Sequence, residues 1–368
     1  MGEHMGETTA AAPDAQQESV LLHRDGRAGR IVLNRPRAIN ALDLAMVRRI
    51  DAALDAWERD ASVAVVVVSG AGERGLCAGG DVRAIRADVL AGGGEASRSF
   101  WREEYRLNAR IARFGRRAGS ASHGKHYVAL MDGIVMGGGV GISAHGSVRV
   151  VTERSAVAMP ETTIGFVPDV GGTYLLSRAP GELGTHLALT AAPVGAADAL
   201  LCGLADAFVP AARLPQFAAA LADQDVEQAL RQYSGEAPPG RLAGQRAWID
   251  ACYSADTVEE ILARLLDSDE PDAKEAAGLI AAKSPTSLKV TLAALRRARR
   301  LDTLEQVLEQ EFRVSCATLT GPDLVEGVRA QVVDKDRSPH WTPPTLAEVD
   351  RAAVERHFAP AGLRPLFG

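Results

Sequence analysis

The sequence predicts an α/β core followed by a mostly helical C-terminal region. Two strand-like runs, Arg30–Asn34 and Val63–Ser69, flank a helical segment, and a third run at Tyr127–Met131 precedes a glycine-rich helix start. A strand, a helix and a strand of this size imply a parallel crossover, so the front half is predicted to be α/β. From about Ala196 the pattern changes to alanine- and leucine-rich helical periodicity, which predicts helices in the back third.

The elements of the front half follow from their patterns. The β-branched run Val63–Ser69 does not alternate, which indicates a strand buried on both faces. The segment Leu42–Trp57 is predicted to be an amphipathic helix with Asp43 near its start as a cap. Its apolar residues recur every fourth position, at Leu42, Met46, Ile50 and Leu54. A further strand is expected at Ser147–Thr152.

Three regions are expected along the chain. Residues 1–18 are small, polar and acidic, which predicts a disordered tail. Residues 19–225 form the predicted core and residues 226–368 the mostly helical C-terminal region, with a soft boundary near residue 225. Two prolines and a glycine predict a surface loop at Gly235–Gly240.

Composition excludes several classes of protein. The 368 residues, 46% hydrophobic and 24% charged, have an ordinary globular composition. A formal net charge of −6 gives no basic field for nucleic acid. The longest apolar run, Val63–Val68, is far shorter than the roughly 20 residues of a membrane span, and no export signal is expected. Four scattered cysteines without a C-x-x-C pair fit free thiols in a reducing cytosol and suggest neither a disulfide framework nor a zinc knuckle.

Glycine-rich turns follow two of the predicted strands, at Cys77–Asp81 and at Met136–Gly141. Such turns let backbone N–H groups approach a ligand closely. A nucleotide-phosphate site is disfavoured because neither turn has the lysine of a P-loop or the G-x-G-x-x-G spacing. Two readings remain open: tight packing turns, or two N–H groups that converge on one carbonyl oxygen as an oxyanion hole.

Two carboxylates, Glu161 and Asp169, lie eight residues apart in an otherwise apolar segment. An ionised group in such surroundings is costly unless it is paired or used in chemistry. For Asp169 the alternative is an N-cap of a helix at Val170–Leu176. Asp81 is interpreted as the cap of the next helix, and His145 as a buried structural histidine.

The motifs A-G-G-D, M-G-G-G-V-G, M-P-E-T-x-I-G and P-D-V-G-G, in this order from Ala78 to Gly172, resemble those of the crotonase superfamily. The last two resemble the hydroxyisobutyryl-CoA hydrolase branch in particular. Further similar motifs place the likeness over roughly residues 30 to 340. They are L-N-R-P-x-x-x-N-A-L at Leu33–Leu42, E-E-Y at Glu103–Tyr105, S-P-T-S-L-K at Ser284–Lys289, and E-G-V-R-A with D-K-D at Glu326–Asp336.

The resemblance implies a crotonase-like spiral of ββα units whose oxyanion donors are the N–H groups of Gly80 and Gly138. It also implies that Ala78 and Glu104 bind substrate. For Glu104 the alternative is a solvated, salt-bridged helix face, because its neighbours are also charged.

Two departures favour a hydrolase over a hydratase. Hydratases of the superfamily carry a glutamate three residues after the second oxyanion glycine, whereas Gly141 stands here, and Asp169 stands where they carry glycine. The expected reaction is hydrolysis of a short, branched 3-hydroxyacyl-CoA with Glu161 as nucleophile or general base. Asp169 would orient the water or the substrate hydroxyl. An enoyl-CoA hydratase or isomerase and a catalytically silent acyl-CoA binder remain alternatives.

Further expectations concern partners. Coenzyme A is expected as part of the substrate. No metal or redox cofactor is expected, because the implied chemistry is acyl transfer with carboxylates and backbone donors. Valine breakdown follows by analogy alone. The resemblance also implies that the C-terminal helices cover the acyl-CoA site, and that the chain forms a homo-oligomer, since many relatives are trimers. The basic residues Arg116, Arg117 and Lys125 of the long 114–126 loop either meet coenzyme A phosphates or are simply solvated. The segment Leu288–Arg300 is interpreted as a helix packed on the core rather than one that binds a membrane or partner.

Overall fold

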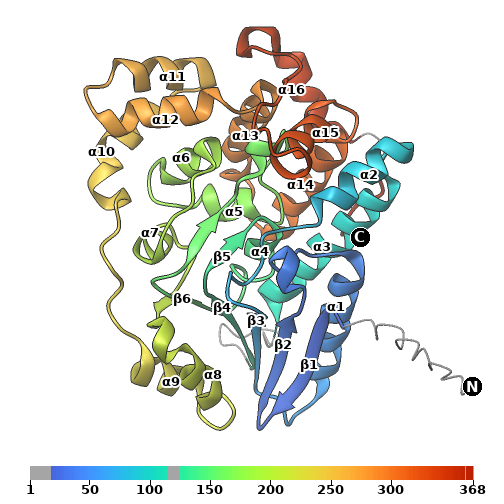
Figure 1. Cartoon of the computed structure of the whole chain (residues 1–368), viewed down its shortest axis with the longest axis vertical. Helices are drawn as coiled ribbons and strands as arrows, with labels where there is room; N and C mark the ends of the chain where they lie inside the picture. Colours follow the sequence, from blue (N-terminus) through green and yellow to red (C-terminus); the bar gives the residue numbers. More distant parts are fainter. Residues whose placement is uncertain (1–17, 115–123, 361, 368) are drawn as a thin grey trace, which may run out of the picture.

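A six-stranded, mostly parallel sheet forms the centre of the fold (Figure 1). The computed structural model describes residues 18–114, 124–360 and 362–367. The strand order is β1-β2-β3-β4-β6-β8, with β1 antiparallel to β2 and each later pair parallel. Its strands are β1 (Val20–Asp25), β2 (Ala28–Leu33), β3 (Val65–Gly70), β4 (His126–Met131), β6 (Val148–Val151) and β8 (Ala207–Phe208).

A second, two-stranded sheet forms a short second layer, and its strands alternate along the chain with strands of the central sheet. Its strands β5 (Ile134–Met136) and β7 (Ala156–Ala158) pair in parallel, and Cys77 forms a parallel bridge to Val135 of β5. Three segments that are separated in the sequence, around Cys77, β5 and β7, therefore run side by side in one direction. Because parallel segments end at the same edge, the turns that follow them emerge together.

Helices cover the sheet and extend beyond it (Figure 1). The amphipathic helix α1 packs on β1, β2 and the long helix α3. The helices of the front half are α1 (Leu44–Arg59), α2 (Val82–Gly92), α3 (Glu95–Arg113), α4 (Gly138–Gly141), α5 (Gly172–Leu176), α6 (Leu183–Thr190), α7 (Ala196–Leu201) and α8 (Leu214–Ala220). Those of the back half are α9 (Val226–Tyr233), α10 (Leu242–Tyr253), α11 (Val258–Asp267), α12 (Pro271–Ala281), α13 (Pro285–Ala298), α14 (Leu304–Thr318), α15 (Asp323–Val328) and α16 (Arg351–His357).

The predicted strands and first helix are confirmed with shifted ends. Strand β3 begins two residues later than predicted and is buried over its first four valines. Helix α1 begins at Leu44, because the Asp43 side chain accepts a hydrogen bond from the Met46 N–H and so caps the helix. Asp81 caps α2 in the same way, through the Ala84 N–H.

The segment Leu288–Arg300 is a helix packed on the core, as predicted. It forms most of α13, and two arginines of its basic end, Arg296 and Arg299, both pair with Glu182, each at 2.8 Å. Within the described part of the chain, no helix combines the length and apolar character needed to cross a bilayer.

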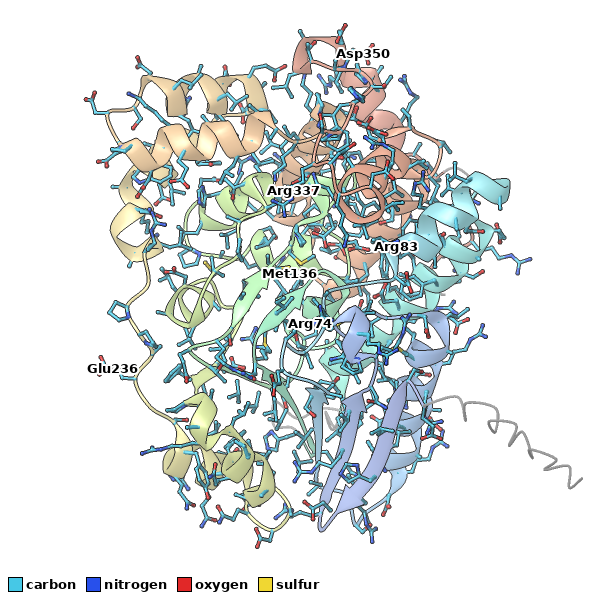
Figure 2. All side chains as sticks on the ribbon, viewed as in Figure 1. Arg74, Arg83, Met136, Glu236, Arg337 and Asp350 are labelled. Atoms are coloured by element: carbon cyan, nitrogen blue, oxygen red, sulfur yellow. The ribbon has the colours of Figure 1, made fainter. Side chains whose placement is uncertain are left out.

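Other expectations have mixed outcomes. The loop Gly235–Gly240 is largely exposed, and Glu236 lies at the edge of the molecule (Figure 2). All four cysteines are buried and free of disulfides. Of the predicted tail, residues 1–17 lie outside the described residues, whereas Glu18 pairs with Arg49. The boundary near residue 225 falls between α8 and α9 and stays a prediction.

The close contact between the second layer and α4 gives a stability test. A Cβ on Gly139 would lie 2.4 Å from the Cys77 carbonyl oxygen, whereas one on Gly244 of α10 would meet nothing within 4 Å. We expect Gly139→Ala to lower the free energy of unfolding by about 1–3 kcal/mol. Gly244→Ala should raise it by about 0.5–1 kcal/mol. Urea denaturation measures both, and equal effects of the two substitutions would contradict the packing described.

Candidate active site

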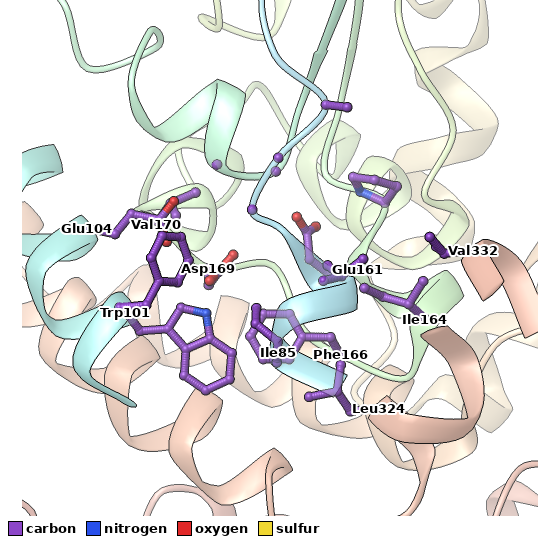
Figure 3. A pocket seen from close by; sticks show the side chains of 18 of the residues that line it. Ile85, Trp101, Glu104, Glu161, Ile164, Phe166, Asp169, Val170, Leu324 and Val332 are labelled. Carbon is purple, nitrogen blue, oxygen red and sulfur yellow. The ribbon is translucent and has the colours of Figure 1, made fainter. Parts of the chain in front are cut away.

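A cavity of about 230 Å3 lies where the second-layer turns meet the helices (Figure 3). Its lining includes the predicted site residues Ala78, Gly80, Glu104, Gly138, Glu161 and Asp169. The structure thus brings together, from four separate stretches of the chain, all the residues that the sequence analysis singled out for catalysis or substrate binding.

The two glycine turns present adjacent backbone N–H groups to this cavity. The position of a Cβ on Gly138 would be only 3.3 Å from the nitrogen of Gly80, so the two backbones are in close contact. Within the described residues, neither the Gly80 nor the Gly138 N–H donates to a protein acceptor, whereas the Ala78 N–H donates to the Ile39 carbonyl. Two unused donors at one point have the arrangement that an oxyanion requires. Helix α4 begins at Gly138 as predicted but has only four residues, so its dipole adds little.

Glu161 and Glu104 flank this pair of donors. A Cβ on Gly137 would lie 2.7 Å from Glu161 Oε1, and a Cβ on Gly138 would lie 2.6 Å from Glu104 Oε1. Gly137 also has a φ of 50°, which favours glycine. Glycine is therefore required here both for the backbone and for the space that the carboxyl groups occupy.

Glu104 is buried rather than solvated. It is 2% exposed, and its Oε1 has no hydrogen-bond partner in the described structure. The alternative of a salt-bridged surface position is therefore wrong for Glu104 and right for its neighbour Glu103, which pairs with Arg48 at 2.6 Å. The register of α3 decides this, because it turns Glu104 inward with Trp101 and Tyr105.

Asp169 is held by a hydrogen bond from a buried phenol. The Tyr105 hydroxyl donates to Asp169 Oδ2 at 2.5 Å and lies 2.8 Å from Ser315 Oγ. Asp169 is 5% exposed, Tyr105 is fully buried, and so is Ser315. A carboxylate with a buried donor keeps its orientation and gains stability in the ionised form.

The site concentrates carboxyl groups without a cation. Burial raises the pKa of Asp169 to about 7, against the opposing effect of the Tyr105 hydrogen bond. Burial, and then the negative charge of Asp169, raise the pKa values of Glu104 and Glu161 well above the usual range. Within the described residues, no lysine, arginine or histidine forms a salt bridge with any of these three groups. They therefore share protons near neutral pH.

Asp169 does not cap the following helix, so that alternative is wrong. Helix α5 begins at Gly172, and its N-terminal N–H groups are bound instead by Glu311 of α14. Glu311 accepts from the Gly171 N–H at 2.6 Å and from the Thr173 N–H at 2.9 Å. Burial raises the pKa of Glu311 to about 8. With Glu311 at the helix end, the Asp169 side chain is left free to face the cavity (Figure 3).

The turn after Asp169 is strained. Val170 has a φ of 52°, a conformation that a β-branched residue rarely adopts. The contacts around it hold the turn in place, because His145 Nε2 lies 2.7 Å from the Val170 carbonyl oxygen and Glu311 binds the next N–H. Burial lowers the pKa of His145 to about 4, so the ring is neutral and has the structural role that was predicted.

Gly141 is enclosed by two side chains. A Cβ at this position would lie 2.7 Å from Val170 Cβ and 2.9 Å from Asn108 Nδ2. This last position of α4, where a hydratase glutamate is expected, has no room for one here. Of the two glutamates at the cavity, Glu161 comes from the segment after β7 and Glu104 from α3.

The walls of the cavity are apolar. Trp101 stacks on Phe166 with ring centroids 5.1 Å apart, and Ile85 lies nearby (Figure 3). Leu324 of α15 and Val332 of the adjoining π-helical segment (Arg329–Val333) complete the lining. The C-terminal helices thus cover the cavity. Among the basic residues of the 114–126 loop, Lys125 donates to the Trp57 and Asp60 carbonyls, whereas Arg116 and Arg117 lie outside the described residues.

Sequence reasoning missed Glu311 and Ser315 as parts of the site and did not assign a role to Tyr105. A signal for the first two was present. In α14 they lie on the helical stripe of buried residues that includes Leu304 and Leu308, at the spacing of an apolar face. A carboxylate and a hydroxyl on such a face indicate buried partners, although periodicity does not say which.

Comparisons with known proteins agree with this geometry. The model of the enoyl-CoA hydratase/isomerase family matches residues 28–358. A mitochondrial 3-hydroxyisobutyryl-CoA hydrolase from Danio rerio is 42% identical over 94% of this chain and 91% of that protein. Its counterpart from Homo sapiens is 41% identical over 94% of this chain and 89% of that protein.

Two solved structures are also similar over nearly their whole length. A carnitinyl-CoA dehydratase from Mycobacterium thermoresistibile is 54% identical, with a TM-score of 0.89 and coverage of 94% of this chain and 97% of that chain. An enoyl-CoA hydratase from Rhodobacter sphaeroides is 42% identical, with a TM-score of 0.86 and coverage of 94% and 98%.

The raised pKa of Asp169 predicts how stability depends on pH. The folded protein binds this proton more tightly than the unfolded chain, so Asp169 lowers stability progressively as pH rises from about 4 to about 7. We expect Asp169→Asn to remove this loss and to raise the melting temperature at pH 8 by about 2 °C or more. The gain should vanish near pH 4 in thermal scans.

Asp43→Asn supplies the matched control. Asparagine caps a helix about as well as aspartate, so this variant should melt within about 1 °C of the parent at both pH values. A gain from Asp169→Asn that is equal at pH 4 and pH 8 would contradict the burial of an ionisable carboxyl group.

Proposed function

Because the chain belongs to the enoyl-CoA hydratase/isomerase family, the crotonase superfamily, we propose that it hydrolyses a short, branched 3-hydroxyacyl-CoA. The substrate class is that of 3-hydroxyisobutyryl-CoA, and the products are the free acid and coenzyme A. The observation that carries this proposal is the pairing of Glu161 with Asp169 beside two unused N–H donors, at a turn where Gly141 leaves no room for a second glutamate.

The thioester carbonyl is proposed to lie against the Gly80 and Gly138 N–H groups. These donors would stabilise the negative charge that develops on its oxygen when the carbonyl carbon is attacked. Each such donor typically contributes about 2.7–4 kcal/mol to the transition state. Glu161 follows β7 and its Oε1 lies beside Gly137, so it would be close to a carbonyl carbon bound there.

Two routes are chemically consistent with this placement, and each would begin with transfer of the Glu161 proton to the ionised Asp169. In one, a Glu161 oxygen attacks the carbonyl carbon, the carbon–sulfur bond breaks, and water then hydrolyses the resulting anhydride. In the other, Glu161 takes a proton from water, and the hydroxide adds to the carbonyl carbon before the thiolate leaves. In both, the leaving thiolate takes up a proton. Glu104 and Asp169, whose pKa values are raised by burial, are suitable donors.

Asp169 and Glu104 are proposed to bind the polar end of the acyl group. Asp169 would orient the attacking water or accept a hydrogen bond from the substrate 3-hydroxyl. Glu104, whose Oε1 lies beside Gly138, would bind the substrate from that side. The apolar wall formed by Trp101 and Phe166 suits a short branched chain. Valine breakdown, a cytosolic location and a homo-oligomer stay predictions, and the vertebrate relatives are mitochondrial by name.

Addition or removal of water at the β-carbon is the second candidate. It is favoured by the 54% identity to a carnitinyl-CoA dehydratase, and by the two glutamates that flank the oxyanion turn, one from each side. Such a reaction uses one group for the water and one for the α-proton. Glu161 and Glu104 would have to fill these two roles between them.

Thiol release separates the two candidates. With 3-hydroxyisobutyryl-CoA we expect release of free thiol, and with crotonyl-CoA no loss of the enoyl chromophore. Glu161→Gln should lower kcat by about 10²–10⁴-fold, because the amide can neither attack nor accept a proton. Glu103→Gln, which alters the adjacent ion pair with Arg48 outside the cavity, is the matched control and should retain activity. Hydration of crotonyl-CoA without thiol release would overturn the proposal.

Oxygen-18 labelling separates the two hydrolytic routes. In a single turnover in labelled water, the covalent route places the label in the Glu161 side chain when water attacks the enzyme acyl carbon, and the general-base route places it only in the released acid. Because burial keeps Glu161 beside the oxyanion turn, we expect label in Glu161, detected by mass spectrometry of its peptide. Label found only in the acid would exclude an anhydride that water opens at the Glu161 carbon and would favour the general-base route.

A further inference from the structure

Tyr105 contacts Asp169 without itself lining the cavity. It is a residue of α3, it does not line the cavity, and its hydroxyl is 2.5 Å from Asp169 Oδ2. We propose that Tyr105, supported by Ser315, is a positioning residue that keeps the resting negative charge of the site on Asp169. This inference rests on the proposed function for its catalytic meaning, because Asp169 is assigned a role there.

The hydrogen-bond chain has a direction that follows from its members. An ionised Asp169 only accepts, so the single proton of the Tyr105 hydroxyl is directed to it. The Ser315 hydroxyl, 2.8 Å from the Tyr105 oxygen, must then donate to Tyr105. When Asp169 takes up a proton, the chain can reverse and Tyr105 can donate to Ser315. Tyr105 therefore has a partner in both protonation states of Asp169.

Several carboxyl groups surround Asp169, so it matters for the chemistry which of them carries the negative charge. Facing Asp169 are Glu104 from α3, Glu161 from the 3-10 helix (Glu161–Ile164) and Glu311 from α14, with His145 beyond the Val170 carbonyl. Within the described residues, Tyr105 is the one side chain that donates to the Asp169 carboxylate, while Glu104 Oε1 and Glu161 Oε2 have no partner. The donor thus stabilises a charge on Asp169 in preference to the two glutamates.

Helix α14 supports this arrangement at two points. Glu311 and Ser315 lie four residues apart on its buried face, so both point the same way. Glu311 binds the backbone N–H groups just after the strained Val170, and Ser315 bonds the phenol that holds the carboxylate. The backbone and the side chain of the Asp169 region are therefore both fixed by one helix, which leaves the carboxylate little freedom to turn.

Kinetic pH profiles test the inference. Removal of the Tyr105 donor raises the pKa of Asp169. As the pH is lowered, activity that depends on ionised Asp169 is therefore lost at a higher pH than in the parent protein. In Tyr105→Phe we expect the acid limb of kcat/KM for 3-hydroxyisobutyryl-CoA to move upward by about one unit. We also expect kcat at pH 7 to fall by roughly tenfold, with KM within about twofold. Ser315→Ala should shift the limb in the same direction by less.

Tyr253→Phe is the matched control. Tyr253 is also fully buried, and its hydroxyl contacts His186 Nδ1 at 2.9 Å on α6, outside the cavity. Its profile should overlie that of the parent. A Tyr105→Phe profile that overlies it as well, in an enzyme that releases thiol, would overturn the inference and leave the proposed function intact.

A double-mutant cycle in stability gives a readout that needs no substrate. Tyr105→Phe, Asp169→Asn and the double variant are unfolded with urea at pH 5 and pH 9. The coupling should be larger at pH 9, because the hydroxyl bonds an ionised carboxylate more strongly than a protonated one. Equal coupling at both pH values would contradict the role of Tyr105. Coupling that grows with pH in a protein without thiol release would support that role and overturn the proposed function instead.

Discussion

Parallel pairing of three short segments is the constraint on which the site depends. Cys77 pairs with Val135, and β5 pairs with β7, so the turns after these segments leave the layer at one edge. Gly80, Gly138 and Glu161 come three or four residues after paired positions of this layer. Two backbone donors and a carboxyl group therefore meet without any side chain having to reach far, and the glycines are what allow their close approach.

Burial gives this meeting point its chemical character. Carboxyl groups that share a cavity without a pairing cation resist ionisation, and each negative charge raises the pKa of its neighbours. The fold places one strong donor in this set, the Tyr105 hydroxyl, against Asp169. The strained Val170 and the clamp by Glu311 add conformational restriction at the same residue. These features lower the stability of the fold at the point where the negative charge must have a defined position, and such local destabilisation is typical of active sites.

The crotonase-like α/β fold and the main site residues were predictable from the sequence, and the fold is confirmed by the similarity to solved structures. Motifs that resemble those of the crotonase superfamily predict Gly80, Gly138, Glu161 and Asp169 as site residues, and all four line the cavity. The sequence left the burial of Glu104 undecided, since a charged stretch is equally typical of a solvated helix. The register of α3 resolves it, as only the packed helix determines which face turns inward.

By itself, then, the sequence determined which groups were to be expected in one site, and that their backbone must come close. Strand, turn and cap signals are local and can be read along the chain, as Asp43 and Asp81 illustrate. Only the tertiary structure decided that Glu311, rather than Asp169, binds the start of α5. It also decided that Tyr105 donates a hydrogen bond to Asp169 and contacts Ser315. These contacts join residues 64 to 210 positions apart. No local pattern specifies such pairs, because they arise from how α3 and α14 pack against the same turn.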